Sequence, residues 1–253
     1  MRVLLLLVAL AGCDRVFGLG DPYEDAPGTG TGDAHRGDGP AMPADASGDA
    51  DGRLPTPLLH YRFDGTMAEA GGGAMATCTT SVGAACGYAP GKYGMALHLD
   101  GSSIAEITLP SLPPSFTVIA WVNYAASGPV FDLSQALASS SEVWSLDFSD
   151  MILFSTQSNT GSGVSGAVRP TETWTSVAMT FGAGDVQYLY TDLIATSPVS
   201  VGTLAYGANS VLCVGCRLSQ TPTQYFTGAI DDVYVFDRVL TQAEISAYAS
   251  SAH

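Results

Sequence analysis

The sequence has 253 residues and a formal net charge of −15, because 24 Asp and Glu residues stand against only nine Lys and Arg residues. The few cations are scattered along the chain, which excludes the basic surface that binding of DNA, RNA or anionic lipid headgroups requires. The length suits one domain with a sizeable core, preceded by shorter segments of other composition.

One cation and nine apolar residues (3–11) follow Met1. This run is shorter than the about 20 residues of a membrane-spanning helix, and its charged start and apolar middle are typical of a secretory signal. It ends in Leu10-Ala11-Gly12-Cys13, which resembles the bacterial lipobox. The resemblance implies a signal peptide at 1–12, cleavage before Cys13 and lipid on that cysteine, which anchors the protein in a bilayer. The alternative is an ordinary signal peptide with a chance cysteine.

Residues 13–57 are rich in Gly, Asp, Pro, Ala and Thr, and carry nine acidic residues against three arginines. Such a segment has almost nothing to bury, so we expect a flexible tether that like-charge repulsion extends. The sequence therefore predicts three parts: a signal peptide at 1–12, a lipidated linker at 13–57 and one domain at 58–253. We expect the protein in the cell envelope, on the outer membrane rather than the inner.

The domain begins with Leu59, Tyr61 and Phe63, which alternate with His60 and Arg62 and so predict a strand that turns the latter two towards solvent. Short apolar runs, separated by Gly, Pro, Asp and Ser, predict further strands at 95–99, 105–109, 116–124, 143–148, 151–155, 174–181, 186–191, 210–214 and 230–236. Many short strands with almost no helical periodicity indicate an all-β sandwich or jelly roll.

A single helix is expected near the C-terminus. Thr241 and Glu244 have the spacing of a capping box, and Leu240 and Ile245 have that of the hydrophobic staple that accompanies it. The helix should run to about Ala249 and close one end of the sandwich.

The order of these segments resembles the concanavalin A-like lectin/glucanase superfamily, in its laminin-G-like jelly-roll branch, over about 58–250. The matching runs are YRFDG at 61–65, PGKYGMALHLDG at 90–101, SFTVIAWV at 115–122, WTSVA at 174–178, LYTD at 189–192 and FTGAIDDVYVF at 226–236. The resemblance implies an antiparallel sandwich. One departure is Leu193, where glycine is usual, so we expect a longer hairpin turn or one of another type there.

Four cysteines remain after Cys13, and an exported protein favours disulfides. Of the three pairings, Cys78 with Cys86 and Cys213 with Cys216 are favoured because each closes a local loop. A pairing that joins distant segments and a four-thiolate zinc site are the alternatives, although only one pair has zinc-ligand spacing.

Calcium is the expected metal, because it takes hard oxygen ligands and the domain is acidic. The resemblance implies one structural calcium ion near the first and last strands, with Asp64, Asp100, Asp231 and Asp232 as the matching candidates. The alternative is that Asp64 and Asp100 only form turns with the glycines that follow them.

Catalysis is not expected. Glycoside cleavage needs two carboxylates on one side of the fold, whereas Glu142 and Asp147 have an odd spacing that predicts opposite faces of a strand. The domain's His60 and His98 are expected to point outward, which leaves no convincing base for a serine or cysteine nucleophile.

Sugar binding needs exposed aromatic rings, which pack against the apolar faces of pyranoses. Trp121 and Trp174 are expected in the core, so the candidates are Tyr124, Trp144, Tyr206 and Tyr225, near predicted loops or strand ends. The leading hypothesis is a membrane-anchored module that binds carbohydrate or glycoprotein. The alternatives are a structural or protein-interaction jelly roll without a sugar site and, less favoured, a glycan hydrolase.

Overall fold

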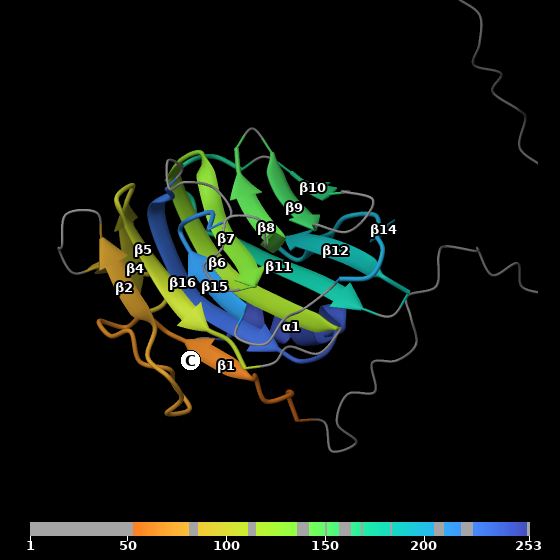
Figure 1. Cartoon of the computed structure of the whole chain (residues 1–253), viewed down its shortest axis with the longest axis horizontal. Coiled ribbons are helices and arrows are strands. Elements are labelled where there is room, and N and C mark those ends of the chain that lie inside the picture. The colour runs from red at the N-terminus through yellow and green to blue at the C-terminus, as the bar shows by residue number, and fades with distance from the viewer. Residues whose placement is uncertain are drawn as a thin grey trace, which may run out of the picture. The chain divides into compact units, whose positions relative to one another are not determined.

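The computed structural model describes residues 53–80, 86–110, 115–135, 142–149, 151–156, 163–167, 169–182, 184–204, 210–218 and 225–251. Within them the chain forms two antiparallel sheets that pack as layers, with one short helix (Figure 1). This is the expected all-β jelly-roll sandwich.

The first sheet is built around the strand at the end of the chain, β16, which lies between β6 and β4. Its strand order is β13-β12-β11-β6-β16-β4-β3, while β1 pairs with β16 and β14 pairs with β12. The bounds are β1 (Leu59–Tyr61), β3 (Gly87–Pro90), β4 (Met95–Asp100), β6 (Phe116–Ala126), β11 (Thr175–Gly182), β12 (Val186–Thr191), β13 (Ile194–Ala195), β14 (Val199–Ser200) and β16 (Thr227–Phe236).

The second sheet has seven strands in the order β10-β9-β8-β7-β15-β5-β2. Its bounds are β2 (Thr77–Thr80), β5 (Ser103–Thr108), β7 (Gly128–Gln135), β8 (Glu142–Phe148), β9 (Ile152–Thr156), β10 (Gly163–Gly166) and β15 (Ser210–Val214). We refer to it as the seven-stranded sheet. Among the sixteen strands formed by the described residues, six have no counterpart in the sequence prediction, namely β2, β3, β7, β10, β13 and β14.

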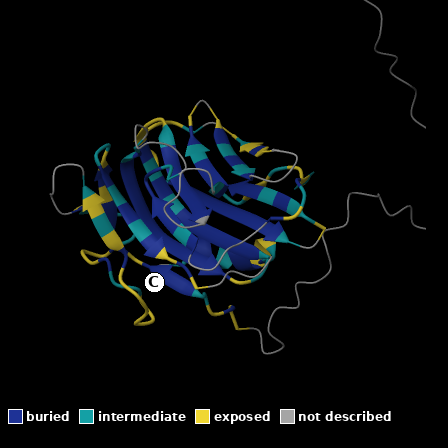
Figure 2. Cartoon of the chain, in the orientation of Figure 1, coloured by how far each residue is buried: buried dark blue, intermediate teal, exposed yellow. Residues whose placement is uncertain are grey.

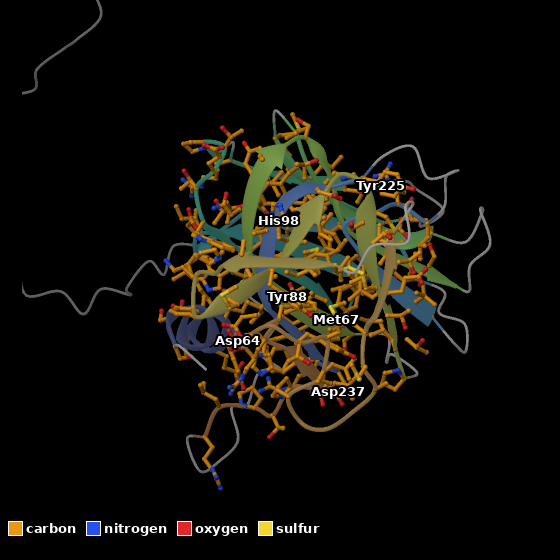
Figure 3. The ribbon with its side chains drawn as sticks, turned by 90° about the vertical axis from the view of Figure 1, so that its left-hand side faces the viewer. Asp64, Met67, Tyr88, His98, Tyr225 and Asp237 are labelled. Carbon is orange, nitrogen blue, oxygen red and sulfur yellow. A yellow bond between two sulfur atoms is a disulfide. The ribbon has the colours of Figure 1, made fainter. Side chains whose placement is uncertain are left out.

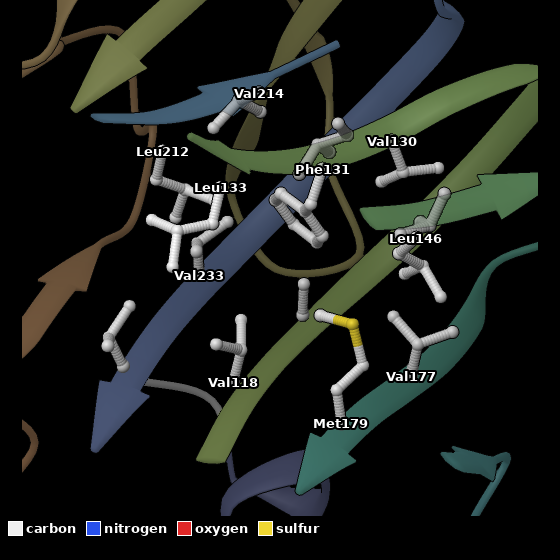
Figure 4. Close-up of a cluster of buried hydrophobic side chains, with 14 of the residues drawn as sticks. Val118, Val130, Phe131, Leu133, Leu146, Val177, Met179, Leu212, Val214 and Val233 are labelled. Carbon is white, nitrogen blue, oxygen red and sulfur yellow. The ribbon is translucent and has the colours of Figure 1, made fainter. Parts of the chain in front are cut away.

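The main core lies between the sheets, where each strand contributes every second side chain. Phe131 and Leu133 of β7 and Leu146 of β8 meet Val118 and Met179 of the facing sheet (Figure 4). Burial follows this layering, since the strand interiors are buried while β2 and many connecting segments carry exposed residues (Figure 2).

The helix α1 (Gln242–Ser250) covers the outer face of the nine-stranded sheet rather than an end of the sandwich. It packs Ile245 and Tyr248 against a second buried cluster of outward-facing strand residues, which includes Ile119, Ala178, Tyr190, Tyr234 and Phe236. The capping box is present, with Thr241 Oγ1 accepting from Glu244 N at 3.2 Å and Thr241 N donating to Glu244 Oε2 at 2.8 Å. Among the described residues, no helix is long and apolar enough to cross a bilayer.

The prediction that His60 faces solvent is wrong, although Arg62 is exposed as expected. The ring of His60 stacks on Tyr234 at a centroid distance of 4.0 Å, and its Nε2 lies 2.9 Å from Asp232 Oδ1. The segment after β1 folds back over this position, because Glu69 Oε1 accepts from His60 N at 3.0 Å.

The hairpin at Leu193 is not lengthened. Thr191 pairs with Ile194, so Asp192 and Leu193 form a two-residue turn in which both have positive φ, 46° and 67°. Positive φ at both central residues is the signature of a type I′ turn, which suits the twist of a hairpin. Leucine therefore occupies a backbone conformation that glycine adopts more easily.

Candidate functional site

The outer face of the seven-stranded sheet carries buried polar side chains at its centre. In β7, Phe131 and Leu133 enter the core, so Asp132 and Ser134, which alternate with them, lie on the outer face. In β8, Ser145 and Asp147 alternate with core residues in the same way. Asp132, Ser134 and Ser145 are all fully buried. Side chains that can hydrogen-bond thus occupy positions where a sheet usually meets solvent.

A bulge brings Glu142 onto the same face. Leu133 of β7 pairs with Trp144, but the next residue, Ser134, pairs with Glu142, so Val143 is an extra residue in β8. An extra residue changes the alternation of faces along a strand. Glu142 and Asp147 therefore do not lie on opposite faces, and the prediction from their odd spacing is wrong.

Arg217 connects these carboxylates. Its guanidinium donates to Asp147 Oδ2 at 2.5 Å and to Ser145 Oγ at 3.2 Å, and its Nε lies 3.8 Å from Glu142 Oε2. Ser145 Oγ also lies 2.9 Å from Ser155 Oγ of β9. We call Asp132, Ser134, Glu142, Ser145, Asp147 and Arg217 the outer-face cluster.

The carboxyl of Asp132 is fully buried, but only one of its two oxygens accepts a hydrogen bond. Ser134 Oγ donates to its Oδ1 at 2.6 Å, whereas the buried Oδ2 accepts no hydrogen bond. Burial raises the pKa of Asp132 to about 7, and the Glu142 carboxylate acts in the same direction. Burial also raises the pKa of Asp147, although the guanidinium of Arg217 acts against it.

The cluster combines one fixed cation, three carboxyl groups and two hydroxyls in a low-dielectric setting. Such groups donate to and accept from hydroxyls, and Asp132 is able to exchange a proton near neutral pH. Sequence reasoning missed Asp132, Ser134, Ser145 and Arg217. The alternation of Phe131 and Leu133 with polar neighbours was a signal for β7, but nothing local in the sequence indicates that Arg217 reaches β8.

Two of the predicted ring platforms are core residues, which corrects their assignment as ligand-binding candidates. Trp144 is fully buried, with its ring stacked on Phe116 at a centroid distance of 5.4 Å and edge-on to Phe154. Tyr124 is buried against Phe148 and donates its hydroxyl to Arg169 O. Rings covered on both sides by protein cannot stack on a sugar.

Of the other two candidates, Tyr206 lies outside the described residues. Tyr225 is half-buried and forms an isolated bridge with Cys216, the residue before Arg217. It is therefore the one predicted ring among the described residues that combines partial exposure with a position in sequence and pairing next to the outer-face cluster.

The two tryptophans expected in the core are both half-buried instead. Trp121 lies beneath Lys92, whose Nζ is 4.3 Å from the centre of the indole ring, and Tyr93 meets the same ring edge-on. Lys92 thus covers one face of the Trp121 ring. Trp174 immediately precedes β11.

The four aspartates proposed for calcium do not form one site. Asp64 accepts from Met95 N at 2.7 Å and Asp231 from Tyr93 N at 3.0 Å, so both brace the turn between β3 and β4. Asp100 lies at the far end of β4, about 16 Å further along an extended strand, and accepts from Ser102. Asp232 faces His60. Across the described ranges, no three His, Cys, Asp or Glu side chains gather as metal ligands.

Asp231 nevertheless has a feature that the turn does not explain. Its Oδ1 is buried and accepts no hydrogen bond, and burial, reinforced by the neighbouring Asp232, raises its pKa to about 7. A calcium ion, which takes six to eight oxygens, would need further ligands. Figure 3 places Asp64 far from Tyr225, whereas Asp100 pairs with Thr227, two residues after Tyr225.

The structure pairs the cysteines as predicted, Cys78 with Cys86 and Cys213 with Cys216, each with Cα atoms 5.7 Å apart. Because both disulfides are formed, these four cysteines do not provide thiolates for the alternative zinc site. Cys13, the predicted lipid acceptor, lies outside the described residues.

Comparisons with known proteins agree with the architecture. The family model described as the concanavalin A-like lectin/glucanases superfamily matches residues 99–246. No curated protein matches the sequence.

Among solved structures, domain 4 of AbnA, a GH43 extracellular arabinanase from Geobacillus stearothermophilus in complex with arabinotriose, is similar with a TM-score of 0.63. It is 20% identical, and the match covers 78% of this chain and 100% of that one. The botulinum neurotoxin serotype G binding domain matches with a TM-score of 0.57 and 14% identity, over 77% of this chain and 51% of that one. A botulinum neurotoxin type C structure, associated with interaction with two ganglioside molecules, matches with a TM-score of 0.55 and 14% identity. The match covers 76% of this chain and 50% of that one. The matched region thus spans about half of each toxin chain.

Proposed function

Because this chain belongs to the concanavalin A-like lectin/glucanases superfamily, we propose that its sandwich binds carbohydrate or glycoprotein without catalysis. Similar structures include an arabinanase domain in complex with arabinotriose and a neurotoxin associated with gangliosides. These likenesses concern the fold, and they support carbohydrate as the ligand class.

The outer-face cluster is the observation that carries this proposal. Carbohydrate sites need convergent donors and acceptors held in fixed positions. Arg217 is held by Asp147 and Ser145, so its remaining N–H groups have a defined direction. Arg217 and Asp147 each keep about a fifth of their side-chain surface exposed, at 20% and 18%, so a ligand on this face would reach them.

Glycan hydrolysis is the second candidate, because the bulge in β8 places Glu142 and Asp147 on one face with Asp132 nearby. A glycosidase needs one protonated and one ionised carboxyl group, and a pKa of about 7 suits the protonated partner. Against this, Asp132 has no exposed surface and Arg217 already engages both other carboxylates. Binding therefore fits the geometry better than turnover.

We further propose that the domain is displayed on a membrane by lipid on Cys13, on the outer membrane rather than the inner. The apolar run at 3–11 and the lipobox-like Leu10–Cys13 support export and the lipid anchor. The acidic segment at 13–57 would give the domain a reach on the order of 40 Å from its anchor if it behaves as a flexible coil.

A glycan array probed with the full chain in mild detergent tests the proposal. We expect binding to at least one glycan by the wild type and its loss in Arg217→Gln. The matched control is Arg62→Gln, which removes an exposed arginine outside the cluster and should leave binding unchanged. Binding to no glycan would leave the structural, protein-interaction role as the better account.

Two further arms separate the alternatives. Parallel arrays with calcium and with chelator test whether a calcium ion contributes, and equal signals would remove calcium from the account. Incubation with the bound polysaccharide tests turnover, and release of reducing ends that is lost in Asp132→Asn would establish the hydrolase instead.

A further inference from the structure

The Cys213–Cys216 disulfide lies directly beside the outer-face cluster. Leu212 and Val214 of β15 enter the core, so Cys213 between them lies on the outer face. There it stands in register with Asp132 of the neighbouring strand β7. The disulfide thus joins the strand next to the cluster to the segment that carries Arg217.

A tight turn lies between the two cysteines. Gly215 has φ +86°, its N–H donates to Val130 O at 2.8 Å, and its carbonyl accepts from Phe226 N at 2.9 Å. Cys216 then bridges Tyr225, and Arg217 follows immediately. The position of Arg217 therefore depends on how this turn leaves β15.

Arg217 is the cation that Asp147 and Glu142 contact. Without it, Asp147 would be a half-buried carboxylate with no opposite charge beside it, and its partial burial would disfavour the ionised form. A constraint on the backbone beside Arg217 is therefore a constraint on the charge balance of the whole cluster.

We propose that the Cys213–Cys216 disulfide positions Arg217, so that the outer-face cluster assembles only in the oxidised chain. The ligand-binding consequence rests on the proposed carbohydrate function, but the positioning of Arg217 does not. Arg217 acts on the ligand site, and the disulfide acts through Arg217.

The oxidation must accompany folding. Two thiols each lose one proton and one electron as the Sγ–Sγ bond forms, and a disulfide of the oxidising compartment accepts the two electrons and two protons and becomes a dithiol. Cys213 and Cys216 are 0% and 2% exposed in the folded chain, so an oxidant or a reductant has little access to them afterwards. The cluster would therefore be incomplete in a reducing cytoplasm and complete after export.

The second disulfide provides a matched control within the same chain. Cys78 belongs to β2, at the edge of the seven-stranded sheet, and Cys86 immediately precedes β3 of the other sheet. β7 and β15 lie next to each other in the seven-stranded sheet, and β5 separates β15 from β2. Opening Cys78–Cys86 should therefore leave the environment of Arg217 unchanged.

A double-mutant cycle on the full chain tests the proposal without any ligand. In the wild type, we expect Arg217→Gln to raise the unfolding equilibrium constant by about tenfold or more, within the range for coupled neighbours. In Cys213→Ala/Cys216→Ala the same substitution should raise it less than about threefold, whereas in Cys78→Ala/Cys86→Ala the tenfold effect should persist. Equal effects of Arg217→Gln in all three backgrounds would overturn the proposal.

The single variant Cys216→Ala is the second test, because it opens the same disulfide and keeps Cys213 in place. It should weaken the effect of Arg217→Gln as the double variant does. If both opened variants lose the sandwich fold by circular dichroism, the disulfide serves the whole domain, and the proposal fails.

The same glycan array adds a functional readout. We expect binding to be lost in Cys216→Ala and retained in Cys78→Ala/Cys86→Ala. An array without signal from the wild type would refute carbohydrate binding, while the stability cycle would still decide the role of the disulfide.

Discussion

Asp132 and Asp231 are carboxyl groups whose pKa burial raises to about 7. Each has one oxygen that is buried without a hydrogen bond. Neither was assigned this character from the sequence, because the shift depends on what the fold places around the carboxyl. Asp132 in particular acquires its neighbour Glu142 through a bulge in the adjacent strand.

The raised pKa of Asp132 predicts a pH-dependent gain in stability for Asp132→Asn. The folded state holds the proton up to about pH 7, while the unfolded state releases it near 3.8, so this carboxyl makes the fold less stable as pH rises between those values. The free energy of unfolding of Asp132→Asn should match that of the wild type near pH 4. Above pH 7, the free energy of unfolding of Asp132→Asn should exceed that of the wild type by at most roughly 4 kcal/mol. Urea titrations at pH 4.5 and 7.5 measure this difference.

Asp100→Asn is the control with the opposite sign. Ser102 and Ser103 donate to the Asp100 carboxylate and lower its pKa, so the ionised form contributes stability that is lost as pH falls through that pKa. This variant should be less stable than the wild type at pH 7.5, and the difference should shrink on acidification. A pH-independent effect of Asp132→Asn would contradict the buried-carboxyl account.

At the scale of elements, prediction succeeded where the signal is local. The strands at 95–100 and 186–191 follow from alternating or continuous apolar residues, and the capping box of α1 requires only residues 241–244. Prediction failed where pairing with a neighbouring strand determines which face a residue occupies. The bulge at Val143 follows from how β8 pairs with β7, and no pattern within 142–147 reports it.

Thr241→Ala should destabilise the domain by about 1 kcal/mol, because it removes the hydroxyl that accepts from Glu244 N at the start of α1. Thr241→Ser keeps that acceptor and should change the free energy of unfolding by only a few tenths of a kcal/mol. Urea denaturation followed by tryptophan fluorescence measures both. Equal losses in the two variants would indicate that the methyl group, and not the cap, carries the effect.

Gly215→Ala should be more harmful than Gly72→Ala, although both glycines have φ +86°. The Cβ added at Gly215 would lie 2.3 Å from Leu99 Cδ1, a fully buried side chain, whereas the Cβ at Gly72 meets nothing within 4 Å. Gly72→Ala therefore bears the backbone strain alone, about 1–2 kcal/mol, and Gly215→Ala bears a core clash in addition. Thermal unfolding of the two variants should rank them in this order, and the reverse ranking would contradict the tight packing of the Cys213–Cys216 turn.

At the scale of the whole molecule, the fold could be predicted because many weak signals agree in order along the chain. The last of them, the FTGAIDDVYVF run, contains the whole of β16. The site was not readable in the same way. Its members come from β7, β8 and the segment after β15, and only the folded sheet brings them together. The predicted rings at Tyr124 and Trp144 failed for the same reason, since closeness to a loop in sequence does not set which face of a strand a residue occupies.

The last prediction concerns the proposed lipid anchor and the chain as a whole. Lipid carried by Cys13 should appear as radiolabelled palmitate incorporated into the wild-type protein and absent from Cys13→Ser. Cys78→Ala removes a thiol of the domain and should remain labelled, which distinguishes acylation of the lipobox-like cysteine from acylation of any free thiol. Several acyl chains on one residue hold a protein on a bilayer durably, since each buried methylene contributes about 0.8 kcal/mol. Wild-type protein should therefore sediment with membranes after a high-salt wash. Label retained in Cys13→Ser would place the lipid on another residue, and release of the wild type by salt would contradict a durable lipid anchor.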